Sequence, residues 1–195
     1  MNKTTIPNGI FLGLAMIICS YVVFALNVNM FFQVRPTILL AALLLLLLKT
    51  GRESRRDNGG SLSFGQGFKN MYVTGAIGIL MCTLFEGVLY SQSAELVEIK
   101  KEIDMKGMEA TMDFFSDNFP GVMSDEVLDE AEDQIENANP AGLDTIFRTF
   151  MTRLFTLVIP VFFLSLLMKR SLPGGGGNER DPADRKRYVI KDDSE

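Results

Sequence analysis

The sequence predicts an all-α integral membrane protein: a bundle of four transmembrane helices with an extracytoplasmic helical hairpin between the third and the fourth. Three observations predict this fold. They are four long apolar runs, a basic loop after the second run, and an acidic stretch between the third and the fourth. The expected spans are residues 10–27, 31–48, 71–90 and 147–168. Each approaches the length of about 20 mostly apolar residues that a helix needs to cross a bilayer.

The length of the chain, 195 residues, suffices for one membrane domain, which we expect over residues 1–170. The mean hydropathy of +0.18 is modest because polar loops dilute the apolar runs. Residues 171–195 contain four consecutive glycines at 174–177 followed by mostly charged residues. Such a composition is typical of a flexible linker, so we expect a disordered cytoplasmic tail.

The types of residue available exclude several kinds of chemistry. The chain contains no histidine, which is the commonest metal ligand and the usual general base near neutral pH. Cys19 and Cys82 both lie in apolar runs, where cysteine behaves as a small packing residue. A disulfide between them, or a metal held by two thiols alone, is a minor alternative. We expect no enzymatic activity, no cofactor and no metal.

The first expected span follows Lys3 and could be mistaken for a signal peptide. Its apolar run, residues 10–26, is longer than the core of about 7–15 residues that signal peptides have. The tripeptide Val23-Phe24-Ala25 is also a poor match to the small residues that precede a cleavage site. We therefore expect a retained span.

The apolar run of the second span is the shortest of the four. Residues 37–48 alone would reach only about 18 Å at about 1.5 Å per residue, so the span is extended back to residue 31. Arg35 is then expected near the outer surface, where its long side chain can reach the lipid headgroups. Pro36 fits the first turn of this helix, where its missing N–H costs nothing.

The distribution of charge predicts the orientation. Residues 49–70 contain 5 basic and 2 acidic residues, whereas residues 91–143 contain 14 acidic and 3 basic residues. Lys and Arg close to the ends of spans are retained in the cytoplasm. The basic loop, Lys169 and Arg170 therefore predict that both termini are cytoplasmic and that the acidic segment is outside.

Two charged residues lie within the last two spans. Glu86 and Arg153 are each expected a turn or two below the outer face, and we predict that they form an ion pair, since an isolated charge in a bilayer is costly. The pair can be a structural clasp, or each side chain can reach the headgroups separately. Alternatively, Glu86 is a proton or cation site in a small transporter.

Other positions in the spans predict local geometry. Pro160 lies inside the fourth span and cannot donate to the carbonyl of Thr156, so a kink is expected there. Two pairs of small residues four apart would allow close contact between helices, within one chain or between subunits. These pairs are Gly9 with Gly13, and Thr74 with Gly78.

The end of the basic loop carries a recognisable motif. Asn58-Gly59-Gly60 predicts a turn. Phe64 and Phe68 are four residues apart, so on a short helix they would share one face lying in the membrane interface. A phosphate-binding loop is discounted because the G-x-x-x-x-G-K-[ST] spacing is absent. The motif reads Ser63, Phe64, Gly65, Gln66, Gly67, Phe68 and Lys69.

With the preceding basic residue, Asp57 and the glycine pair, this motif resembles domain-of-unknown-function family 4199, a group of small bacterial four-helix membrane proteins. The resemblance covers about residues 4–170. It implies a multi-pass protein of the bacterial inner membrane, and it brings no established activity, substrate or site residues.

The segment 91–146 is expected to form the acidic helical insert. Apolar residues recur at steps of three and four residues in its first half, which predicts a helix that Pro120-Gly121 would end. Ser124 or Asp125 would cap a second helix, whose acids we interpret mainly as a solvated face. Weak calcium sites or a partner-binding surface are the alternatives, although the EF-hand pattern is absent. The apolar stripe comprises Met105, Met108, Met112, Phe115 and Phe119; the acids are Asp125, Glu126, Asp129, Glu130, Glu132, Asp133 and Glu136.

These features predict a non-enzymatic interaction or accessory protein of the inner membrane that presents an acidic helical module outside. The alternative is a small transporter or channel that uses Glu86 and Arg153. The expected partners are the lipid bilayer and a protein that binds the acidic insert. Acidity disfavours nucleic acid as a ligand, and self-association is left open.

Overall fold

The computed structural model describes residues 3–118 and 133–169, and within them every regular element longer than one turn is an α-helix. Four helices are long and apolar enough to cross a membrane, which confirms the predicted all-helical fold with four candidate spans. Residues 119–132 of the insert, with Pro120, Gly121 and the proposed cap, lie outside the described residues, as do residues 170–195. The helices are α1 (Thr5–Leu26), α2 (Val28–Gln33), α3 (Arg35–Asp57), α4 (Phe64–Gln92), α5 (Ala94–Asn118) and α7 (Leu143–Met168).

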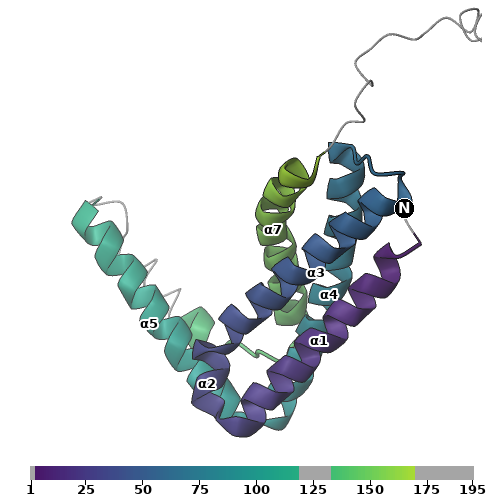
Figure 1. Ribbon diagram of the computed structural model, residues 1–195. Helices are drawn as coiled ribbons and strands as arrows, with labels where there is room; N and C mark the ends of the chain where they lie inside the picture. The colour runs from purple at the N-terminus through teal and green to yellow at the C-terminus, as the bar shows by residue number, and fades with distance from the viewer. Residues whose placement is uncertain (1–2, 119–132, 170–195) are drawn as a thin grey trace, which may run out of the picture.

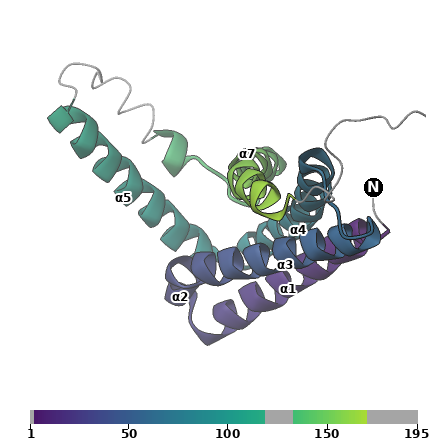
Figure 2. The same cartoon turned by 45° about the horizontal axis from the view of Figure 1, so that its top comes forward.

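Four of the helices, α1, α3, α4 and α7, form a bundle in which α4 contacts the other three, while α5 runs away from it (Figures 1 and 2). The end of α3 and the end of α7 meet, because a Cβ on Gly51 would lie within 3.0 Å of Met168. The start of α1 reaches the same end, where Asn8 Nδ2 donates to Glu53 Oε2 at 2.6 Å. The basic loop therefore lies at one end of the bundle, and α5 begins at the other.

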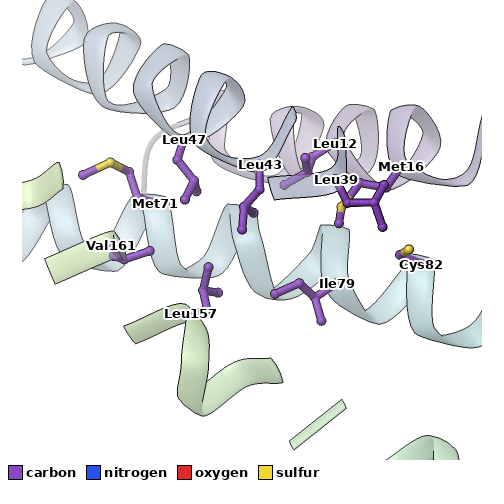
Figure 3. Close-up of a cluster of buried hydrophobic side chains, with 10 residues drawn as sticks. All are labelled: Leu12, Met16, Leu39, Leu43, Leu47, Met71, Ile79, Cys82, Leu157 and Val161. Atoms are coloured by element: carbon purple, nitrogen blue, oxygen red, sulfur yellow. The ribbon is translucent and has the colours of Figure 1, made fainter. Parts of the chain in front are cut away.

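The core of the bundle is a cluster of ten buried apolar side chains from α1, α3, α4 and α7 (Figure 3). Leu12, Leu47, Met71 and Val161 have no exposed surface at all. Burial of this kind fixes how the helices pack against one another.

The outer surface of the bundle is strongly apolar. Phe11, Ile18, Leu45 and Phe155 are all more than half exposed, and the same is true of other large apolar side chains of the spans. Soluble proteins rarely expose a continuous apolar surface of this extent. The exposed belt is the surface that a bilayer would cover.

Small residues bring α1 and α4 into close contact. A Cβ on Gly9 would lie 2.9 Å from the Cβ of Ile77 and 3.1 Å from the carbonyl oxygen of Thr74. A Cβ on Gly78 would lie 2.6 Å from Leu12 Cγ. The predicted pairs of small residues therefore serve a contact within one chain.

The motif at residues 63–69 begins α4 itself, so the expectation of a separate helix in the interface plane is wrong. Ser63 caps α4 by accepting a hydrogen bond from the Gln66 N–H at 3.3 Å. Phe64 packs edge-on against Phe162 of α7, with ring centroids 5.5 Å apart. The helix continues without a break because the apolar span follows the motif directly.

Replacing Ser63 with alanine is expected to lower the free energy of unfolding by about 1 kcal/mol, since an N-cap side chain typically contributes about that much. Titration of the purified protein with a denaturing detergent, followed by circular dichroism, measures the change. Threonine at the same position keeps the acceptor, so Ser63→Thr should remain close to the wild type. An equal loss in both variants would contradict a capping role.

Candidate functional site: a buried cluster of two arginines and a glutamate

Glu86 of α4 is the centre of the site. It is 4% exposed and lies on the face of α4 that is turned into the bundle. Its carboxylate accepts two hydrogen bonds from Arg153 of α7, from Nη1 to Oε1 at 2.7 Å and from Nη2 to Oε2 at 2.8 Å. This bidentate arrangement is the strongest hydrogen-bonding geometry between an arginine and a carboxylate. The structure thus brings together the two residues that the sequence paired.

A second arginine, Arg35 at the start of α3, also binds this carboxylate. Arg35 is 6% exposed, so the expectation that it reaches the headgroups at the outer surface is wrong. Its Nε donates to the hydroxyl of Ser20 on α1 at 2.7 Å. The site therefore connects all four spans of the bundle.

Other contacts hold Arg35 in this position. Its guanidinium lies 4.4 Å from the ring centroid of Phe31, which is 1% exposed, and such stacking favours a cation that is removed from water. The short helix α2 places Phe31 there. The second span was expected to begin at residue 31, with no separate helix before Arg35, so the position of Arg35 was missed; Phe31 four residues before Arg35 was the available signal.

The cluster carries a net positive charge. Two guanidiniums and one carboxylate sum to +1, and the neighbouring Thr83, Ser20 and Cys82 are uncharged. Positive charge on both sides of Glu86 opposes the binding of a cation there. This arrangement disfavours the proton or cation site that the sequence left open.

Two cavities border the cluster on opposite sides. A cavity of about 100 Å³ is lined by Glu86, Tyr90, Lys100 and Asp104 among others, and it lies toward α5. It is large enough for several water molecules, since one needs about 10–15 Å³. A second cavity of about 360 Å³ lies between α3 and α7 and is lined mainly by apolar side chains. Arg153 borders both cavities.

The remaining predicted residues lie away from the ion cluster or at its edge. Pro160 lies within a helix that continues from Leu143 to Met168, and it lines the larger cavity. The hydroxyls of Thr152 and Thr156 donate one turn back, to the carbonyls of Arg148 and Thr152, each at 3.0 Å. Cys82 is 1% exposed, and Cys19 and Cys82 are both free thiols.

A second polar cluster, at the basic end of the bundle, was not predicted. Asn8 donates to Thr50 at 3.3 Å, and Asn70 donates to Ser54 at 3.1 Å. Thr74 donates to the carbonyl of Thr5 at 3.1 Å. These neutral hydrogen bonds join α1, α3 and α4, and single polar residues of this kind give no distinct pattern in a sequence.

Replacing Arg35 with glutamine is expected to cost about 1.5–3 kcal/mol of stability, the range for hydrogen bonds to charged groups. The cost stays moderate because Glu86 retains both of its hydrogen bonds to Arg153. Detergent titration followed by circular dichroism gives the value. Arg52→Gln, at the basic end, is the control; a loss no larger than that of the control would show that Arg35 does not stabilise the bundle.

Four apolar helices around a shared ion cluster define the class of multi-pass helical membrane proteins. Within that class, the family model described as "Protein of unknown function (DUF4199)" matches residues 7–170. The chain belongs to this family, as the motif at residues 63–69 indicated. Comparison with curated proteins and with solved structures found no match.

Proposed function

We propose that this protein is a non-enzymatic accessory protein of the bacterial inner membrane that presents α5 to a protein partner outside the membrane. The observation that carries the proposal is the course of α5, a helix of 25 residues that leaves the bundle (Figure 1). Among the helices that the structure describes, α5 contacts α2 and α4, near its own start. A long helix that contributes little to the bundle core is available for binding.

The surface of α5 supports this role. Ile103 is 41% exposed, and Gly107 has no atom within 4 Å of where a Cβ would lie, so this face is open. Met105, Met108 and Met112 follow one another at helical spacing and are half-buried. Methionine side chains adapt to partners of varied shape. Two ion pairs within the helix, Lys100 with Asp104 and Lys106 with Glu102, keep it polar elsewhere.

The ion pair between Glu102 and Lys106 lies on the exposed surface of α5. The pKa of Glu102 is lowered, mainly by the hydrogen bond from Lys106, and the pKa of Lys106 is raised by the same contact. Both groups therefore stay charged over the physiological range of pH. A partner would therefore meet α5 with Glu102 and Lys106 both charged.

A photoreactive amino acid placed at Ile103 or at Gly107 in cells tests the proposal. Irradiation should link α5 to one reproducible protein partner, which mass spectrometry identifies. Phe155, which is 77% exposed on α7, is the matched control on the apolar belt. Linkage at Phe155 alone, or none at α5, would refute the accessory role. Cysteine labelling from outside the cell at Gly107 tests the proposed orientation separately.

A second function, transport by the bundle, rests on the two cavities that meet at the ion cluster. Since the cluster is net positive, the transported species would be an anion. Flux of a small anion into liposomes that contain the purified protein, with Glu86→Gln as comparison, tests this candidate. Equal flux with and without the protein would eliminate it.

A further inference from the structure

The larger cavity has the features of a ligand site. Its volume of about 360 Å³ falls in the range of roughly 300–1,000 Å³ that is usual for small-molecule sites. Apolar side chains of α1, α3, α4 and α7, such as Met16, Leu39, Ile79 and Leu157, form most of its wall. Among the described residues that line it, Arg35 and Arg153 are the charged ones.

The two arginines lie at the same end of this cavity. Arg35 begins α3, and the wall continues along α3 to Leu43, which is about 12 Å further at about 1.5 Å per residue. On α7 the wall runs from Arg153 to Pro160 in the same direction. The cavity therefore has a cationic end and an apolar remainder.

The cavity reaches the surface of the bundle at the apolar belt. Leu40 of α3 lines it and is 53% exposed, and Thr156 of α7 lines it and is also exposed. A molecule entering between these residues would come sideways from the acyl chains of the bilayer. Such a molecule must itself be largely apolar.

The net positive charge of the site favours a ligand with an anionic headgroup. Arg35 and Arg153 share a single carboxylate, that of Glu86, which leaves one positive charge without a counter-charge inside the site. A charge at this depth in a bilayer is costly unless it is paired. One added carboxylate would bring the sum to zero, and guanidinium groups match a carboxylate in geometry.

We propose that the cavity between α3 and α7 binds a single-chain anionic amphiphile, a fatty-acid carboxylate whose head meets Arg35 and Arg153 and whose chain lies along Leu39, Leu43 and Leu157. A volume of about 360 Å³ suits a single acyl chain, and the one positive charge that Glu86 leaves unbalanced would be neutralised by one carboxylate. This site is independent of the partner-binding role of α5.

The test uses the full-length protein in nanodiscs of a zwitterionic lipid and a photoactivatable palmitate, at an alkaline pH that keeps the carboxylate ionised. Mass spectrometry should place the label on α3 and α7 at the residues that line the cavity. Unlabelled palmitate should compete at about a tenfold lower concentration than hexadecanol, because the alcohol lacks the charge that the arginines bind.

Two variants sharpen the result. Leu40→Trp fills the mouth of the cavity and should reduce labelling about tenfold, whereas Ile18→Trp, at a 62% exposed position of α1 outside the cavity wall, should not change it. If Leu40→Trp fails to fold, the comparison of palmitate with hexadecanol on the wild type decides. Equal competition by hexadecanol, equal competition by a two-chain anionic phospholipid, or label elsewhere would each overturn the proposal.

Discussion

Replacing Glu86 with glutamine is expected to lower the free energy of unfolding by about 3–5 kcal/mol, the cost of removing one partner from a buried ion pair. The reason is the geometry of the cluster. Glu86 is 4% exposed and is the carboxylate shared by Arg35 and Arg153. Without it, two guanidiniums face one another inside the bundle with no counter-charge, and their repulsion adds to the loss of hydrogen bonds.

Detergent titration followed by circular dichroism measures this change, and Glu102→Gln is its matched control. Glu102 also pairs with a cation, Lys106, but on the exposed surface of α5, where such a pair contributes little. The control should therefore differ little from the wild type. Wild-type stability in Glu86→Gln would contradict the structural clasp.

Replacing Gly9 with alanine is expected to destabilise the protein by about 1–3 kcal/mol, the usual cost of inserting a methyl group into a close-packed contact. The new Cβ would lie 2.9 Å from Ile77 Cβ and 3.1 Å from the carbonyl oxygen of Thr74. Neither atom is the end of a flexible side chain, so α1 and α4 must move apart. That movement would also strain the contact between Ser20 and Arg35.

The matched control is Gly107→Ala on α5, where the added Cβ meets nothing within 4 Å. Alanine in an open helical position should stabilise the protein by about 0.5–1 kcal/mol. The two substitutions are chemically identical and should have effects of opposite sign in the same detergent titration. A gain of stability in Gly9→Ala would show that α1 and α4 are not in close contact at this point.

How much the sequence could predict depended on the kind of signal. The four spans follow from the length of the apolar runs, which reflects the thickness of a bilayer. Glu86 and Arg153 could be paired because both were expected a turn or two below the outer face, on the last two spans, where an isolated charge is costly. The structure adds the detail that both oxygens of Glu86 are used.

Arg35 was misplaced because it precedes the apolar run of residues 37–48, so that reaching the headgroups and turning inward are equally compatible with the sequence. The inward position of Arg35 depends on α2 and on Phe31, which is buried in a cluster formed by α1, α2, α4 and α5. Likewise, the two cavities are products of packing between helices far apart in the chain. No local pattern of residues encodes the space that separates α3 from α7.

The shared carboxylate has a consequence for the order in which the protein is made. Arg35 precedes Glu86 by 51 residues, and Arg153 follows Glu86 by a further 67. At a synthesis rate of about 5–20 residues per second, Arg35 waits several seconds in the membrane for its acid. During that time no carboxylate is present to pair with Arg35, so burial of the charged end of α3 is unfavourable. The cluster of Arg35, Glu86 and Arg153 is complete only when α7 has been inserted. A chain that lacks α7 therefore differs from the finished protein in a feature that membrane-protein quality control would be able to recognise.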